Sequence, residues 1–266
     1  MSIHEEIKDQ QKKLKDQSFK ARWEYFWDYY KVHVIIGVIA LIVIISTVRS
    51  FMTSKPFALY GFFLNSGYEA DSVEIEEEYA QYAQIDTSKS RCLVDMSMTF
   101  NQTNLDQMTM AASQKITASI AAKEVDFLGA DSDTFSYYAS QDLFADLRTV
   151  FSEEELKAFG DNIYYVDRAY IEYIASDEYQ NQFLNNTYDE NNEYSVMAHK
   201  ALTEGFFDAP AKENMKDPIP VGIILKNSAA LKKAGAYIEN KIPVVGIVSN
   251  TTRIDNAIMF LKYMSE

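Results

Sequence analysis

Cysteine is nearly absent from this chain of 266 residues, which contains a single one, Cys92. One cysteine cannot form an intramolecular disulfide, so a domain outside the cytoplasm would have to be held together by its hydrophobic core. Cys92 lies in the apolar-rich run RCLVDMSMTF. This setting predicts a buried structural thiol rather than a reactive one.

Histidine is also scarce, and the motifs of common enzyme classes are missing. Of three histidines, His4 and His33 belong to the N-terminal tail and the long apolar run, which leaves His199 in the remainder. The sequence has no G-x-S-x-G, H-E-x-x-H, P-loop or glycine-rich dinucleotide motif. We therefore expect a protein that is not an enzyme and uses no cofactor. A cell-envelope hydrolase with a carboxylate pair is a less favoured alternative.

Positive charge is depleted after residue 50. Residues 51–266 carry seventeen Lys or Arg against thirty-three Asp or Glu, whereas residues 1–50 carry eight against six. Because this acidic segment repels nucleic acid and anionic lipid, we expect no nucleic-acid partner. Cations, peptides and neutral solutes remain possible ligands.

Two acidic clusters could supply oxygen ligands to a metal ion. Asp131-x-Asp133 lacks the later bidentate glutamate of a calcium loop, and the cluster at 189–193 lacks its glycine turn. Both are typical of helix caps and solvated loops, so we predict no metal site.

What the chain does have is a long apolar run, Val32 to Val48, between Lys31 and Arg49. At about 1.5 Å per residue the run is slightly shorter than a hydrocarbon core of about 30 Å, so we expect the transmembrane helix to cover residues 32–52. Lys31 and Arg49 are then placed to reach the two membrane interfaces.

The run is predicted to be an uncleaved signal-anchor. About thirty residues precede it, too many for the n-region of a signal peptide, and residues 46–50 offer no small-x-small cleavage site. Basic residues are denser before the run than after it, which places the N-terminus in the cytoplasm and residues 53–266 outside the cell membrane. The basic residues concerned are Lys15, Lys20, Arg22 and Lys31 before the run, and Arg49 and Lys55 after it.

Four large aromatic residues precede the run at helical spacing: Trp23, Phe26, Trp27 and Tyr30. Positions i, i+3, i+4 and i+7 share one helix face. The stripe predicts an aromatic belt in contact with the lipid bilayer, and a docking face for a partner helix is the alternative. Residues 1–31 thus form a cytoplasmic tail and a juxtamembrane aromatic helix.

Residues 53–266 alternate short apolar runs with amphipathic ones, which is typical of α/β proteins. The fold expected is an open, mostly parallel α/β domain. The run at 57–64 is apolar on both faces, as in a central strand covered on both sides. The other predicted strands are 93–100, 125–129, 221–225 and 242–248, and the clearest predicted helices are 73–85, one capped by Thr103 and Asp106, 135–147, one capped by Ser152 and Glu155 and ended by Gly160, one capped at Ser228, and one capped by Thr252 and Asp255.

The middle of the domain is less regular. Aromatic and β-branched residues over 163–174 predict a hairpin that turns at Asp167 and Arg168. The polar, Asn-rich stretch 176–195 predicts an exposed excursion or a lid.

The order of these segments resembles a known family. The succession strand, helix, strand, helix, VDFLG, then DSDTFSYYASQDLFADLRTVFSEEELKAF and finally VVGIVSNTTRIDNAIMFLKYM resembles the type 2 periplasmic solute-binding proteins of ABC importers. The resemblance implies one lobe of that fold, with 160–217 as an insertion or a reduced second lobe. With FWDYYKVH before the span, the whole chain also resembles uncharacterised single-span membrane proteins of Gram-positive bacteria.

Polar side chains follow the predicted strands. Open α/β sheets bind ligands at the carboxyl ends of their strands, and helix N-termini there suit a polar or anionic group. Tyr137 and Tyr138 could stack on a sugar or peptide, or simply pack. Turn and cap chemistry is the alternative role for the predicted site residues, which are Asn65, Ser66, Gly67, Asn101, Asp131, Ser132, Asn250 and Thr251.

Two functions of different classes follow. The favoured one is capture or sensing of a small polar ligand beside a membrane partner such as a permease. The alternative is a scaffold or accessory subunit of a membrane complex that binds no small ligand.

Overall fold

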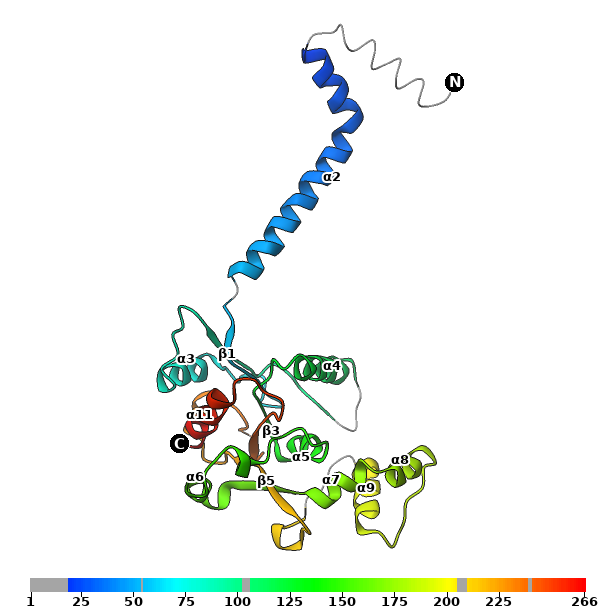
Figure 1. Ribbon diagram of the computed structural model, residues 1–266, viewed down its shortest axis with the longest axis vertical. Coiled ribbons are helices and arrows are strands. Elements are labelled where there is room, and N and C mark those ends of the chain that lie inside the picture. Colours follow the sequence, from blue (N-terminus) through cyan, green and yellow to red (C-terminus); the bar gives the residue numbers. More distant parts are fainter. Residues whose placement is uncertain (1–18, 54, 102–105, 205–209, 239–240) are drawn as a thin grey trace. The chain divides into compact units, whose positions relative to one another are not determined.

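The chain divides into two compact units, one ending at Lys55 and one running from Pro56 to Glu266 (Figure 1). The computed structural model describes residues 19–53, 55–101, 106–204, 210–238 and 241–266.

The described residues of the first unit form one long helix, α2, which runs from Phe19 to Thr53. Its window Tyr30–Arg49 is 20 residues long and apolar enough to cross a membrane. At about 1.5 Å per residue this window measures about 30 Å, the thickness of a hydrocarbon core. The polar side chain of Thr47 is accommodated within the helix, because its hydroxyl donates to the carbonyl oxygen of Val43 at 2.8 Å.

The aromatic stripe lies on the first turns of α2. Trp23 stacks on Trp27 with ring centroids 6.4 Å apart, and Phe26 stacks on Tyr30 at 5.3 Å. These contacts confirm that the spacing places the rings side by side on the helix, and all four are exposed. Lys31 and Arg49 lie at the two ends of the apolar window. Whether the stripe contacts lipid or a partner helix stays a prediction.

The second unit is built on a six-stranded mixed sheet, in the order β2-β1-β3-β6-β5-β4. Strand β1 pairs in parallel with β2 and β3, whereas β6 is antiparallel to β3 and to β5, and β5 is antiparallel to β4. Four of the six strands therefore run in one direction, which confirms a mostly parallel α/β sheet. The strands are β1 (Phe57–Phe63), β2 (Arg91–Asp95), β3 (Phe127–Asp131), β4 (Ile163–Asp167), β5 (Pro218–Ile224) and β6 (Pro243–Ile247).

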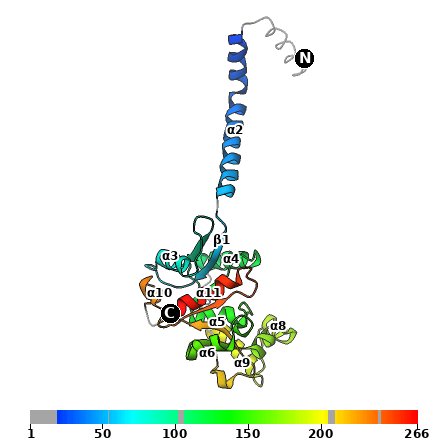
Figure 2. The same cartoon turned by 60° about the vertical axis from the view of Figure 1, so that its left-hand side comes forward.

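Helices cover both faces of this sheet, as the doubly apolar run at 57–64 predicts (Figures 1 and 2). Leu59 and Phe63 of β1 pack on one face with α3, α10 and α11, while Tyr60 and Phe62 pack on the other with α4 and α5. Side chains alternate between the faces of a strand, so a central strand must be apolar throughout. The helices are α3 (Val73–Tyr82), α4 (Gln107–Ala121), α5 (Ser132–Ser140), α6 (Glu153–Ala158), α7 (Arg168–Ile174), α8 (Asp177–Leu184), α9 (Glu193–Glu204), α10 (Ala229–Lys233) and α11 (Ile254–Ser265), with short 3₁₀ turns at 147–149, 160–162 and 212–214.

Cys92 lies in the first of these two cores, and its side chain is buried. Burial raises the pKa of the thiol to about 11, and the nearby Glu76 carboxylate adds to the effect. The interpretation of Cys92 as a structural thiol is therefore confirmed.

Two of the predicted helix caps are confirmed, one is wrong, and one involves a residue outside the described part of the chain. Ser152 and Glu155 form a reciprocal capping box at α6, and Ser228 caps α10. Helix α4 is capped by Asp106, which accepts from the Thr109 amide, while Thr103 lies outside the described residues. Helix α11 has no side-chain cap, since Arg253 precedes it and Thr252 plays no capping part.

The hairpin predicted over 163–174 is wrong. The chain forms β4 and then turns directly into α7, with Asp167 as the N-cap whose side chain accepts from the Ala169 amide. Strand β4 pairs with β5 instead of with residues 168–174. The aromatic residues after Asp167 serve a helix because Tyr170 and Tyr173 are buried in a small separate core with α9. The stretch 176–195, predicted to be an excursion or lid, contains α8 and the first residues of α9.

Candidate functional site

Asn65 organises the edge of the sheet where β1 and β3 end. Its amide nitrogen lies 2.8 Å from Asp131 Oδ2, 3.0 Å from Thr134 Oγ1 and 3.0 Å from the carbonyl oxygen of Phe100. Its amide oxygen accepts from the Phe100 amide at 2.8 Å. Asn65 has a positive φ of 57°, a conformation that asparagine tolerates well. The structure thus brings Asn65 and Asp131 together, and the Asn65 side chain holds this edge rigid.

Ser66 and Gly67 continue the same turn. Ser66 is buried, and its hydroxyl donates to the carbonyl oxygen of Met96 at 2.8 Å. Tyr237 reinforces the turn, because its hydroxyl donates to the Leu64 carbonyl at 2.6 Å and its amide donates to the Ser66 carbonyl at 2.9 Å. Gly67 has φ +113°, which side chains rarely adopt. This turn is therefore held in place from two sides.

Strand β2 ends earlier than predicted, and the segment after it forms the opposite wall. The predicted strand 93–100 stops at Asp95, whose carboxylate accepts from the amide and hydroxyl of Ser97 at 2.9 and 2.7 Å. Such an Asx turn competes with a sheet ladder and redirects the chain. Residues 96–99 consequently lie beside the Ser66 turn instead of extending the sheet.

Between the two walls lies an open cleft of about 790 Å³, here called the sheet-edge cleft. Small-molecule sites have volumes of about 300–1,000 Å³, so the cleft is large enough for a metabolite. Its lining combines apolar with polar groups. The lining residues are Asn65, Ser66, Gly67, Tyr68, Ala70, Asp71, Ser72, Leu93, Val94, Asp95, Met96, Ser97, Met98, Thr99, Met108 and Lys241.

The charges of the cleft differ in how far they are already engaged. Asp95 binds the Lys115 ammonium at 2.6 Å, and Asp71 accepts from the Val73 amide at 3.0 Å. Burial would raise the pKa of Asp95, but hydrogen bonds from Lys115 and Ser97 outweigh it and lower that pKa. Lys241 is exposed and is the basic residue among those that line the cleft. Its ammonium is the group that an anionic ligand would meet.

Three further predicted site residues lie at this edge but do not line the cleft. Asp131 caps α5 and accepts from the Thr134 amide at 3.2 Å, and the carbonyl of Ser132 accepts from Ser136 Oγ at 2.6 Å. Asn101 is exposed and follows directly after Phe100. The cap chemistry considered for these residues accounts for Asp131.

Asn250 and Thr251 were predicted at the same edge, and this placement is wrong. Because β6 runs antiparallel to β3, the carboxyl end of β6 lies at the opposite edge of the sheet. There the Asn250 amide donates to the Ile120 carbonyl at 2.9 Å, and Thr251 Oγ1 donates to Asp126 Oδ1 at 2.5 Å. Both residues therefore lie away from the cleft, and Thr251 belongs to a cluster of hydrogen bonds around Asp126.

No protein-family model, curated protein or solved structure matches this chain. The resemblance to solute-binding proteins stays a prediction, and only the geometry of the site bears on what it could bind.

The cluster that contains Thr251 centres on Asp126, a residue that the sequence analysis did not single out. Asp126 is fully buried, and its carboxylate accepts from the Tyr60 amide at 2.8 Å and from Arg253 Nε at 2.9 Å. Arg253 also donates to the carbonyl of Glu124. A single aspartate inside the apolar run VDFLG was the available signal, because a buried carboxylate requires a partner.

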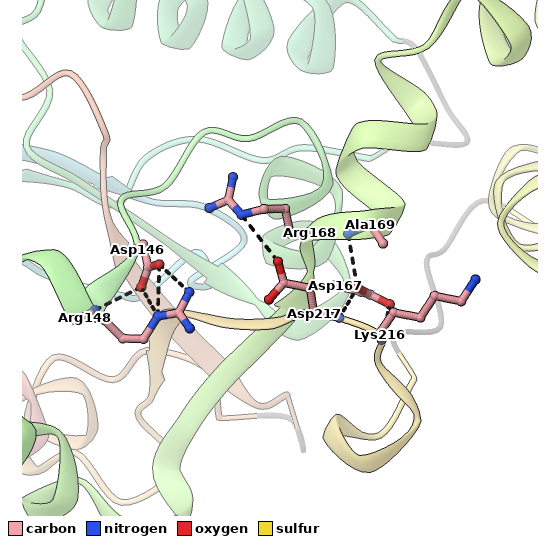
Figure 3. Close-up of polar contacts among 7 residues, drawn as sticks. All are labelled: Asp146, Arg148, Asp167, Arg168, Ala169, Lys216 and Asp217. Carbon is pink, nitrogen blue, oxygen red and sulfur yellow. Dashed lines mark hydrogen bonds and ion pairs between the residues drawn. The ribbon is translucent and has the colours of Figure 1, made fainter.

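A second charged group surrounds the end of β4 (Figure 3). Arg148 binds Asp146 through Nε and Nη2, the latter at 2.6 Å, and Arg168 Nε lies 4.0 Å from Asp217 Oδ2. Asp167, in the same view, is engaged by backbone amides. These side chains pair with one another locally, and exposed pairs of this kind contribute little stability.

The metal-ligating, histidine and tyrosine side chains considered in the sequence analysis do not come together at one site. Among the described residues, no three His, Cys, Asp or Glu side chains are placed to bind a metal ion. His199 stacks face to face on Tyr188, with ring centroids 4.0 Å apart. Tyr138 packs against Phe100 and is buried, whereas Tyr137 lines a separate cavity among α5, α7, α8 and α9.

Proposed function

We propose that this protein is a membrane-anchored, extracytoplasmic binding protein that captures a small polar solute carrying an anionic group, such as a carboxylate, in the sheet-edge cleft. The observation that carries the proposal is a cleft of about 790 Å³ whose walls are tied together by the hydrogen bonds from the Asn65 amide to the Met98 carbonyl and from the Ser66 hydroxyl to the Met96 carbonyl, and whose lining includes the exposed Lys241. The ligand's charged group would meet Lys241.

The hydrogen bonds between the two walls of the cleft favour ligand binding. Because the Ser66 turn and the residues after β2 already hydrogen-bond to each other, a ligand would not have to order them, and less free energy is lost on association. Met98 and Met108 offer flexible, polarisable side chains to the carbon skeleton of the solute. The positive charge of Lys241 orients the anionic group of the solute. Together these groups have the mixed apolar and polar character of small-molecule sites.

The test is ligand-induced stabilisation of the purified full chain. A solute at 100 times its Kd should raise the unfolding free energy by about 2.7 kcal/mol, seen as a rise in Tm across a panel of carboxylate-bearing metabolites. We expect Lys241→Gln to weaken binding of the responding solute about tenfold, since one ion pair is lost. Lys89→Gln, which changes an exposed lysine outside the cleft, should leave binding unchanged.

Two outcomes would contradict the proposal. If no member of a broad metabolite panel shifts Tm, the proposal of ligand capture is wrong and the scaffold alternative is favoured. If a solute binds but Lys241→Gln has no effect, binding occurs elsewhere.

The proposal also requires that the domain face the exterior, which the excess of basic residues before the apolar run of α2 supports. We expect a membrane-impermeant maleimide to label Tyr68→Cys on intact cells, because Tyr68 is 98% exposed. Ser2→Cys should be labelled after lysis only. The wild-type chain is the control, because Cys92 is buried. Labelling of Ser2→Cys but not Tyr68→Cys on intact cells would reverse the orientation.

A further inference from the structure

A second cavity lies among the helices α5, α7, α8 and α9, where α7 contacts each of the other three (Figure 1). Its volume is about 660 Å³, within the range of small-molecule sites. We call it the helical cavity. It shares no lining residue with the sheet-edge cleft.

The walls of the helical cavity are aromatic and aliphatic. Tyr137, Tyr170 and Tyr179 come from three different helices, and Ile171, Ile174 and Leu202 supply aliphatic surface. Tyrosine rings present a negative π-face that attracts cations. The cavity therefore suits an apolar body that carries a positive charge.

The electrostatics of the cavity point the same way. None of the described residues that line it is a lysine or an arginine, while Asp142 is an exposed acidic residue of the lining. The last residues of two helices, Ser140 of α5 and Ile174 of α7, also line it, as does Thr203 in the last turn of α9. Helix C-termini carry partial negative charge, so their fields add to that of Asp142.

We propose that the helical cavity is a binding site for a small organic cation, an ammonium group attached to an apolar or aromatic body. The ammonium lies near Asp142 and the helix ends, and the apolar body packs among the tyrosines. The net negative charge of residues 51–266 raises the local concentration of such cations. This site is independent of the sheet-edge cleft, which is proposed to take an anionic solute.

The experiment compares a cation with its neutral analogue. Full-length protein in phosphatidylcholine nanodiscs is titrated calorimetrically with 2-phenylethylammonium and with 2-phenylethanol, with empty nanodiscs as the blank. We expect the ammonium to bind at least about tenfold more tightly than the alcohol. Equal affinity for the two, or binding of neither, would overturn the proposal.

Two variants locate the binding. Ala201→Phe places a ring in the cavity and should abolish binding of the cation, whereas the matched Ala122→Phe, at an exposed position at the end of α4, should not. Asp142→Asn should reduce the preference for the ammonium to below about threefold. Asparagine tolerates the left-handed backbone of this position, where φ is 56°, so the fold should persist.

Two control variants and one contradicting result complete the test of the cation site. Asp161→Asn removes an exposed carboxylate that does not line the cavity and should leave the preference intact. If Ala201→Phe binds the cation as well as the wild type does, the site lies elsewhere and the proposal is wrong. Lys241→Gln should not affect the cation, so failure of this proposal is distinguishable from failure of the sheet-edge cleft.

Discussion

Replacement of Asp126 by alanine is expected to lower the free energy of unfolding by about 3 kcal/mol or more. The carboxylate is fully buried and joins three parts of the domain: the Tyr60 amide of β1, Thr251 after β6, and Arg253 before α11. Its removal leaves the Tyr60 amide without that acceptor in a buried setting and leaves Arg253, whose side chain is 22% exposed, without its counter-charge.

Urea denaturation of the purified full chain would measure this loss. The control is Glu153→Ala, since Glu153 forms an exposed pair with Lys157 at 3.7 Å and should cost less than about 1 kcal/mol. A loss below 1 kcal/mol for Asp126→Ala would show that the cluster is not a structural anchor.

Replacement of Asp167 by asparagine should cost about 2 kcal/mol at pH 7. The buried Asp167 carboxylate accepts from the Lys216 and Asp217 amides at 2.9 and 3.0 Å and from the Tyr194 hydroxyl at 2.8 Å (Figure 3 shows the two amides). It also accepts from the Ala169 amide as the cap of α7. Asparagine keeps the shape but has one acceptor oxygen in place of two, and it carries no charge.

The cost should depend on pH. Burial would raise the pKa of Asp167, but its hydrogen bonds outweigh burial and hold that pKa below the ordinary value of about 3.9. A lowered carboxylate pKa stabilises the fold fully above the unfolded value and loses that contribution as pH falls through the folded value. The stability difference between wild type and Asp167→Asn should therefore be constant from pH 7 to about pH 5 and shrink by pH 3.

Denaturant titrations at pH 7, 5 and 3 provide the measurement, with Asp161→Asn as an exposed control that should show little difference at any of them. A difference that is as large at pH 3 as at pH 7 would mean that the carboxylate's charge plays no part in holding α7 and β5 together.

The parts of the fold that depend on local pattern were predictable. The apolar helix, the doubly apolar β1 and the capping box of α6 each follow from the spacing of side chains a few residues apart. The meeting of Asn65 and Asp131 was also predictable, because both follow parallel strands, whose carboxyl ends share an edge.

Other features depended on partners distant in the chain. The run at 242–248 is buried on both faces whichever way it points, so its pattern held no sign that β6 is antiparallel and that Asn250 and Thr251 lie at the opposite edge. The residues around Asp167 could have supported a strand or a helix. Pairing of β4 with β5 and burial of Tyr170 and Tyr173 against α9 selected the helix.

The sequence by itself determined an apolar helix long enough to cross a membrane, an acidic α/β domain and the absence of common catalytic motifs, because composition and short-range periodicity express these directly. The tertiary structure alone decided the direction of β6, the burial of Asp126 and the two cavities. Each of these depends on which surfaces meet when segments far apart in the chain pack together, and on which hydrogen bonds and charges that packing leaves to be satisfied.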